Sequence, residues 1–234
     1  MFRRLTRLFS DASEMIFPAV CGVCGRPLVD GETLICMSCD YDMPRCGIES
    51  ESFNVVHQRL ARPGLPIERA ASFFYYFRGN PYAMLIQMAK YNNRPSIAMT
   101  FGTSFARELR QTAFFNDIDV LLPMPLHFLK KMRRGYNQTE YIARGISAES
   151  GIPIGDNLSA ARHKSQARLK AVERQKNMEG IIRVRNANEL VGQHVLVIDD
   201  VITTGATMLS AIKALHQAVP NIRTSVLSLA LTKI

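Results

Sequence analysis

Two adjacent carboxylates, followed by a short loop rich in hydroxyl groups, are the residues of this chain best suited to chemistry. They lie in the stretch HVLVIDDVITTGAT, residues 194–207. The run before the acids is apolar at odd and even positions alike and mostly β-branched, which is typical of a strand buried on both faces of a parallel sheet. Apolar residues recur at helical spacing after the loop, at Met208, Leu209, Ile212 and Leu215. The sequence therefore predicts a strand, a polar turn and an amphipathic helix in succession.

The turn predicts a site for a sugar phosphate. Backbone N–H groups at the start of a helix lack intrahelical partners, so they would face an anion such as a phosphate monoester. Asp199 and Asp200 would repel a bare phosphate at close range, so a hydroxyl-bearing part of the same ligand must reach them. The 2′- and 3′-hydroxyls of a ribose supply such donors. The residues expected to hold the phosphate are Thr203, Thr204, Gly205, Ala206 and Thr207.

Gly205 is expected to let an anion approach the backbone closely, so a valine there should abolish binding without unfolding the domain. A Walker-type phosphate loop is excluded because no lysine follows this glycine. A strand, turn and helix that bind no ligand are the alternative.

A cluster of cations follows the prolines of residues 122–127 and is a second candidate site, called the second cationic turn below (residues 133–135). Arg133 and Arg134 can make charge-assisted hydrogen bonds, and Gly135 lets the backbone approach an anion before the next helix begins. This turn is suited to a second phosphate group. The alternative is an arginine pair that is merely solvated.

Four cysteines have the spacing of a metal site. Cys21 pairs with Cys24 and Cys36 with Cys39, with eleven residues between the pairs, which predicts two knuckles around one structural Zn²⁺. A reducing cytosol disfavours the rival interpretation of two disulfides. Cys46 has no cysteine mate and is either a free thiol or a substitute ligand.

Composition is typical of a folded protein with an anionic partner. The chain has 234 residues, 47% of them hydrophobic, and a formal charge of +9. Such a charge attracts nucleic acids and polyphosphate metabolites, although a solvated basic surface without a partner is the alternative. No apolar stretch approaches the roughly 20 residues of a membrane span, and the basic N-terminus lacks the features of a secretory signal. We therefore expect no membrane insertion and a cytoplasmic location.

The expected elements alternate between strand and helix. Residues 1–14 suggest a basic amphipathic helix, and residues 50–66 have the texture of a linker, so we place a boundary near 60 and expect domains at 1–60 and 61–234. Strands are expected at 70–77, 119–125, 181–185 and 222–232, helices from 82, at 96–114 and at 136–150, and a mobile loop at 153–180. This order predicts an α/β fold with one central parallel sheet.

From about residue 18 onward, several motifs occur in a distinctive order. They are the two cysteine pairs, Gln87-Met-Ala-Lys90-Tyr91, the Pro-Met-Pro of 123–125, the Arg-Gly-Tyr-Asn-Gln of 134–138, the stretch 166–177 and the Asp-Asp-Val-Ile-Thr-Thr-Gly-Ala-Thr of 199–207. Together they resemble the ComF family of competence-related, amidophosphoribosyltransferase-like proteins. The resemblance implies a type I phosphoribosyltransferase fold with an N-terminal zinc ribbon. Some relatives carry a third cysteine pair, which is reduced here to Cys46.

The resemblance also implies a ligand and roles for its contacts. The ligand is phosphoribosyl pyrophosphate with Mg²⁺, bound through its 5-phosphate at 203–207 and through its ribose at the two acids. Arg133, Arg134 and Gly135 look like the pyrophosphate loop. Gln166 and Arg174 represent a basic flexible lid, for which a plain surface helix is the alternative. Lys90 matches the family's lysine-tyrosine pair without a firm role.

Two functions of different classes follow from this resemblance. The first is a phosphoribosyltransferase linked to nucleotide metabolism or DNA uptake, in which Asp199, Asp200 and Arg134 are the catalytic residues. No motif identifies its acceptor. The second is a non-catalytic competence factor or adaptor that binds single-stranded DNA and a helicase. The sequence leaves the oligomeric state open.

Overall fold

The computed structural model describes residues 19–46, 54–91, 94–126, 132, 134–160 and 182–233. The expected helix at 1–14 and the site candidates Arg133, Gln166 and Arg174 lie outside these residues. The chain divides into two compact units, Met1–Met43 and Pro44–Ile234. Within the described residues, no helix combines the length and the apolar character of a membrane-crossing segment.

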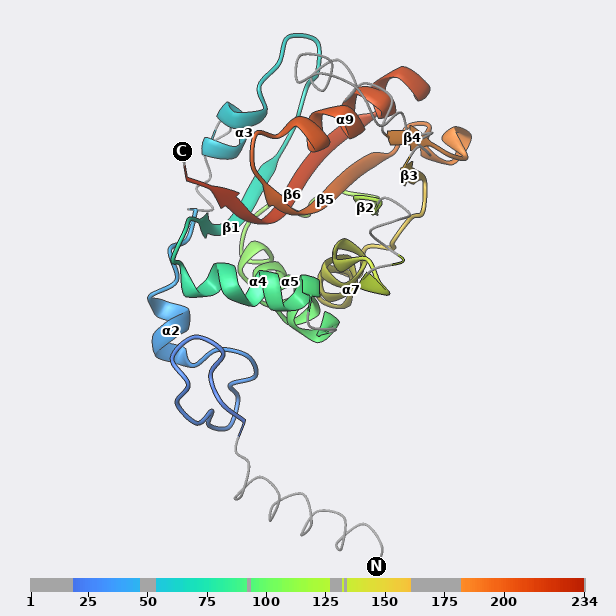
Figure 1. Ribbon diagram of the computed structural model, residues 1–234. Coiled ribbons are helices and arrows are strands. Elements are labelled where there is room, and N and C mark those ends of the chain that lie inside the picture. Colours follow the sequence, from blue (N-terminus) through green and yellow to red (C-terminus); the bar gives the residue numbers. More distant parts are fainter. Residues whose placement is uncertain are drawn as a thin grey trace, which may run out of the picture. The chain divides into compact units, whose positions relative to one another are not determined.

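The larger unit is built on a four-stranded sheet in the order β1-β6-β5-β2 (Figure 1). The strands are β1 (Ala70–Tyr76), β6 (Arg223–Thr232), β5 (His194–Ile202) and β2 (Val120–Pro123). Every neighbouring pair is parallel, so the carboxyl ends of all four strands lie at one edge. The central parallel sheet expected from the sequence is confirmed.

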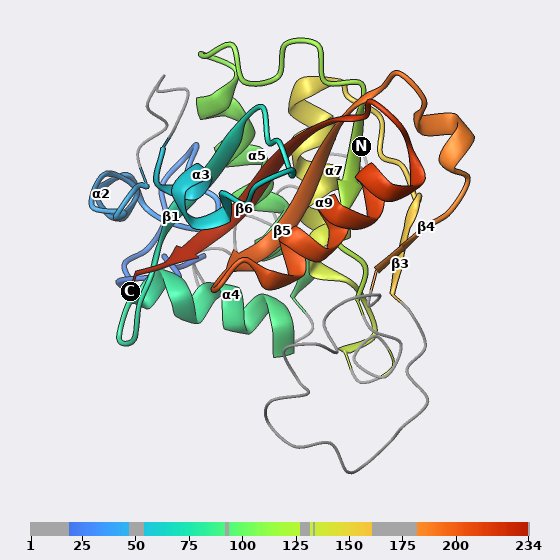
Figure 2. The ribbon, with the colours of Figure 1, turned by 90° about the horizontal axis from the view of Figure 1, so that it is seen from above.

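Helices cover both faces of this sheet (Figures 1 and 2). One face carries α4 (Pro81–Tyr91), α5 (Pro95–Leu109) and α7 (Gln138–Ser150), and the other carries α3 (Val55–Leu60) and α9 (Ala206–Ala218). Two further helices lie within the described residues, α2 (Met37–Tyr41) in the smaller unit and the 3₁₀ turn η1 (Ala187–Leu190).

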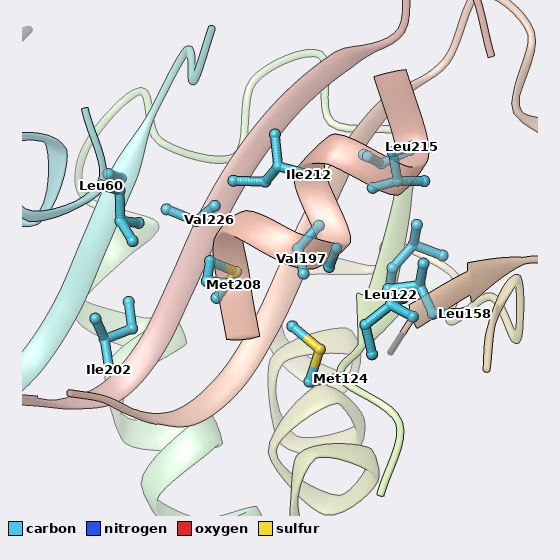
Figure 3. Packing of buried hydrophobic residues seen from close by; sticks show 14 of the residues in the cluster. Leu60, Leu122, Met124, Leu158, Val197, Ile202, Met208, Ile212, Leu215 and Val226 are labelled. Carbon is cyan, nitrogen blue, oxygen red and sulfur yellow. The ribbon is translucent and has the colours of Figure 1, made fainter. Parts of the chain in front are cut away.

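Each face has its own apolar core. On the α9 side, Met208, Ile212 and Leu215 pack over Val197 and Val226 of the sheet (Figure 3). On the opposite side the core is aromatic: the rings of Phe73 and Phe105 stack with centroids 4.6 Å apart, and Phe74 and Phe101 lie beside them. Burial on both faces explains why β5 is apolar at consecutive positions.

The segment expected to be a linker contains α3. Asn54 caps this helix by accepting hydrogen bonds from the backbone N–H groups of Val56 and His57. Val56 and Leu60 are buried in the core of the larger unit. The units therefore divide at Met43, earlier than the boundary near residue 60, because the residues after Asn54 pack with the sheet.

A second, two-stranded antiparallel sheet consists of β3 (Leu158–Ala160) and β4 (Ile182–Val184). The expectation of a structureless loop from 153 was wrong for residues 158–160, and the strand near 181–185 pairs here rather than in the central sheet. Leu158 and Ile182 are both buried in the apolar core, which holds the pair in place. Strands of three residues are too short to produce a readable alternation.

Helices α5 and α7 approach each other through two glycines. A Cβ atom on Gly145 of α7 would overlap the backbone of Met99 and Thr103, and one on Gly102 of α5 would overlap the backbone of Ile142. Because α7 begins directly after the second cationic turn, this close packing helps to fix where that turn lies.

We predict that Gly145→Ala destabilises the larger unit by about 1–3 kcal/mol, because the methyl group overpacks a contact between two backbones. This loss should exceed the gain of up to about 1 kcal/mol in helix propensity. The free energy of unfolding in urea measures the effect. Ser96→Ala, on the exposed surface of α5, is the control and should change stability by less than about 0.5 kcal/mol. An unchanged or increased stability of Gly145→Ala would show that the helices separate freely.

Candidate functional site

The predicted phosphate turn lies where β5 leaves the sheet and α9 begins. β5 ends at Ile202, and Gly205 is the N-cap of α9 with a left-handed backbone, φ +81°. Because Gly205 has no side chain, it does not cap the helix. The N–H of Ala206 donates to Oγ1 of Thr204 at 3.4 Å, and the N–H groups that follow can face an anion. Thr203, Thr204 and Thr207 are exposed, so their hydroxyls can reach the same ligand.

The carbonyl side of this turn is held by Arg59, which no sequence motif indicated. Arg59 Nη1 donates to the backbone oxygen of Thr203 at 2.5 Å, and Nη2 donates to that of Thr232 at 3.0 Å. The guanidinium thus connects α3 to both the turn and the end of β6. Its position orients the peptide at Thr203 and adds positive charge close to the predicted phosphate turn.

Gly205 is required for a different reason from the one expected. A Cβ atom there would overlap Cδ2 of Leu60, which is buried beneath the turn. The side-chain direction at this position therefore points toward α3. A valine at this position would therefore meet the end of the Leu60 side chain rather than the anion, and it would strain a positive φ, which differs from the expectation that it would block the anion and leave the fold intact.

The two acids lie at the carboxyl end of β5, and both are partly buried. The Oδ1 atom of Asp199 accepts a hydrogen bond from the backbone N–H of Asp200 at 2.8 Å. The carboxylate of Asp200 forms an ion pair with Lys90 of α4, with Nζ and Oδ2 2.9 Å apart. The structure thus brings Lys90 to the acids, a partnership that the sequence alone did not reveal.

The second cationic turn lies at the carboxyl end of β2. The side chains of Asn137 and Thr139 donate to the backbone oxygen of Met124 at 3.0 and 2.6 Å, which ties the start of α7 to the end of the strand. Gly135 has φ +79°, with open space where a side chain would lie. Arg134 donates to Gln138 at 3.2 Å. Since β2 and β5 are adjacent and parallel, both turns lie at the same edge of the sheet.

A cavity of about 560 Å³ lies next to the residues that follow β2 and begin α7. It is bounded by the end of β2, the first half of α7 and β3, and its polar lining includes Asn137, Glu140 and Arg144. The two acids and the residues 203–207 do not line it, so it is separate from the expected sugar-phosphate site.

The paired cysteines form one cluster in the smaller unit. The sulfur atoms of Cys21, Cys24, Cys36 and Cys39 lie within 4.8 Å of one another, and those of Cys24 and Cys36 are 3.8 Å apart. Four ligands at the usual Zn–S distance of about 2.3 Å would form a tetrahedron with edges of about 3.8 Å. The donor set therefore suits a tetrahedral metal ion.

Local hydrogen bonds lower the pKa of the thiols of Cys21 and Cys36, whereas burial raises the pKa of the Cys39 thiol. Burial raises the pKa of the Cys21 thiol, but donation from backbone N–H groups, including that of Cys36 at 3.3 Å, lowers it to about 6 overall. All five cysteines are described, and none of them forms a disulfide.

Cys46 has a different environment. It belongs to the larger unit and is buried among apolar side chains such as Val56 and Leu60. Burial raises the pKa of its thiol to about 12, which favours a neutral core residue over a thiolate ligand.

One family model matches most of the larger unit of this protein. The model of a family described as the phosphoribosyl transferase domain matches residues 96–231, which is more than half of the chain. The match includes both turns and both acids. The cysteine cluster lies outside it.

Two curated relatives cover most of the chain. DNA utilization protein YhgH of Escherichia coli O157:H7 is 26% identical over 207 residues, which cover 82% of this chain and 88% of that protein. Competence protein ComFC of Bacillus subtilis is 24% identical over 196 residues, which cover 84% of this chain and 71% of that protein. Among solved structures, a glutamine phosphoribosylpyrophosphate amidotransferase from B. subtilis gives a TM-score of 0.41 at 15% identity, covering 60% of this chain and 30% of that one.

We predict that Gly205→Ala lowers the free energy of unfolding by about 1–3 kcal/mol, because alanine meets Leu60 and disfavours a positive φ. Leu60→Ala removes the collision partner. In a double-mutant cycle, the double variant should therefore be more stable than the sum of the two single effects by at least about 0.5 kcal/mol. Urea unfolding of the four proteins measures this coupling. Strictly additive effects would mean that the side chain at 205 does not point toward α3.

Proposed function

Because the chain belongs to the phosphoribosyl transferase domain family, and by its relatives to the ComF group, we propose that the larger unit binds phosphoribosyl pyrophosphate at the carboxyl end of β5. The observation that carries this proposal is that two acids at the end of β5 are followed, after a short loop, by a helix N-terminus whose N-cap glycine has no side chain. A ribose 5-phosphate group has the complementary arrangement, with a diol on one side and an anion on the other.

Each part of the ligand then has a partner among the described residues. The N–H groups of Thr204 to Thr207 would hold the 5-phosphate, with Arg59 orienting the turn from behind. Asp199 and Asp200 would accept hydrogen bonds from the ribose hydroxyls. The diphosphate would face Arg134 and Gly135 at the end of β2. Arg133, Gln166 and Arg174, which lie outside the described residues, are proposed as further diphosphate contacts.

We propose that the protein also transfers the phosphoribosyl group. The bond between C1 of the ribose and the pyrophosphate oxygen breaks as an acceptor bonds to C1, and positive charge develops on the ring. Asp199 and Asp200 would stabilise that charge, and Arg134 would neutralise the charge gained by the leaving group. The carboxylate oxygens suit Mg²⁺, which when bound would neutralise further charge on the diphosphate.

For the smaller unit we propose a structural Zn²⁺ held by Cys21, Cys24, Cys36 and Cys39. Its described segments contain one helix of five residues, and Met43 is the one buried apolar side chain among them besides the cysteines, so metal binding would supply much of its folding free energy. Retention of four reduced thiolates would also suit the cytoplasmic location expected from the sequence.

A second candidate function is that of an adaptor that binds single-stranded DNA and a helicase during DNA uptake. The formal charge of +9 favours it, as do the names of the two relatives, a DNA utilization protein and a competence protein. DNA contacts of this kind would weaken steeply with salt, because phosphate binding releases counterions. Binding in a ribose-phosphate site depends on particular acids instead.

We predict that calorimetry with phosphoribosyl pyrophosphate and Mg²⁺ detects binding to the wild type, and that Asp200→Ala weakens it at least tenfold. The reason is that charge-assisted hydrogen bonds to the ribose each contribute about 1.5–3 kcal/mol. Glu149→Ala is the control, because it removes a carboxylate at the other end of α7. Wild-type protein that does not bind this ligand would contradict the proposal.

The same preparation separates transfer from binding. Incubation with labelled ligand and a panel of bases, amines and ammonia should release pyrophosphate with one acceptor. Binding without release across the panel, together with salt-sensitive binding of single-stranded DNA, would favour the adaptor.

We predict about one zinc ion per chain, and we predict that Cys36→Ser lowers this stoichiometry and unfolds the smaller unit while the sheet remains intact. The loss follows from removal of a thiolate ligand. Elemental analysis and amide NMR spectra measure the two effects. Cys46→Ala is the matched control and should retain zinc. A metal-free protein with an ordered smaller unit would contradict the assignment.

A further inference from the structure

The side chain of Lys90 is mostly buried and forms an ion pair, unlike that of a typical surface lysine. It lies in the last turn of α4, and its ammonium is 2.9 Å from the Oδ2 atom of Asp200. Only 19% of the lysine side chain and 16% of the aspartate side chain are exposed. Ion pairs shielded from water are screened less by salt than surface pairs. The pair therefore occupies one oxygen of an acid to which the proposed function assigns the ribose hydroxyls.

The backbone beside this lysine is attached to the second cationic turn. The hydroxyl of Tyr136 donates to the backbone oxygen of Ala89, and Nε2 of Gln138 donates to that of Lys90 at 3.4 Å. Arg134 in turn donates to Gln138. One residue thus has its backbone at the turn suited to the diphosphate and its ammonium at the acids suited to the ribose.

The chemistry of lysine allows its ammonium to move from the acids to the second cationic turn. Its ammonium is a compact charge on a flexible four-carbon stem, and its three donors impose no planar geometry on a partner. When the backbone is fixed, rotation of the side chain moves the charge over several ångströms. A carboxylate oxygen and a diphosphate oxygen are equally acceptable partners for it.

We propose that Lys90 is the internal counterion of Asp200 in the ligand-free protein and moves its ammonium to the diphosphate when a ribosyl diphosphate binds. The inference rests on the proposed function and deepens it. The ribose diol then binds the Asp200 oxygen that Lys90 has left. The diphosphate gives the Lys90 ammonium a new anionic partner. Ribose 5-phosphate has no diphosphate, so its binding breaks the ion pair between Lys90 and Asp200 without giving the ammonium a new partner. Lys90 is therefore a specificity-determining residue that selects the diphosphorylated ligand over ribose 5-phosphate.

The test compares two probes on the full chain by calorimetry in the same Mg²⁺ buffer: phosphoribosyl pyrophosphate and ribose 5-phosphate. Lys90→Met keeps the length of the side chain and removes its charge. We expect it to weaken binding of the diphosphate at least tenfold while ribose 5-phosphate binds equally well or severalfold more tightly. The ratio of the two affinities therefore falls at least tenfold. Lys90→Arg, which retains the charge, should preserve most of the ratio.

Arg110→Met is the matched control for the loss of one positive charge. Arg110 lies at the C-cap of α5, pairs with Glu149 and is 59% exposed. Both affinities of this variant should remain within twofold of the wild type. Thermal unfolding verifies that each variant is folded, and Lys90→Gln replaces Lys90→Met if the methionine variant does not fold.

The outcomes distinguish this inference from the proposed function. Wild-type protein that binds both probes, combined with a Lys90→Met variant whose affinities fall in parallel or do not change, would overturn the role of Lys90 alone. A parallel fall would assign Lys90 to general attraction of anions. Wild-type protein that binds neither probe would overturn the proposed function and this inference with it.

Discussion

The burial of β5 on both faces determines where the acids lie. Val195 and Val197 pack under α9, and their neighbours Leu196 and Ile198 are equally inaccessible to solvent. A strand held in this way cannot slip by one residue without moving apolar side chains into the wrong layer. Its register with β6 and β2 is therefore fixed, and Asp199 and Asp200 emerge at the edge where the neighbouring strands also end. The rest of the site is assembled around that fixed point.

The opposite edge of the sheet carries charges of a different kind. Arg223 at the start of β6 pairs with Glu68 and with Asp117, at 2.6 and 2.7 Å. His194 at the start of β5 is fully buried beside them, and burial lowers its pKa, so it is neutral near pH 7. This network ties the amino ends of the strands to the loops before them. Structural ion pairs thus lie at one end of the sheet, and the groups suited to a ligand lie at the other.

A structural feature of this protein could be predicted when its residues are contiguous in the sequence. The strand, turn and helix around 194–218 could be predicted because one uninterrupted stretch carries the apolar run, the acids and the glycine. The cysteine cluster could be predicted for the same reason. Lys90 and Asp200 are more than a hundred positions apart, so no local pattern indicates that they form an ion pair. Helix α3 was missed because its six residues lie just before Pro63, Gly64 and Pro66, whose turn-forming character dominates that segment.

The contact between α3 and the turn at 203–205 affects where the larger unit begins. The family match begins at residue 96, and a boundary drawn by composition falls near 60. Arg59 and Leu60, which support Thr203 and Gly205 from behind, precede both limits. A fragment starting at residue 61 would contain the sequence motifs of the larger unit and yet lack the two side chains that contact the turn at 203–205. The smallest autonomous form of this unit must therefore include the short helix that, judged by composition, belongs to the connection before it.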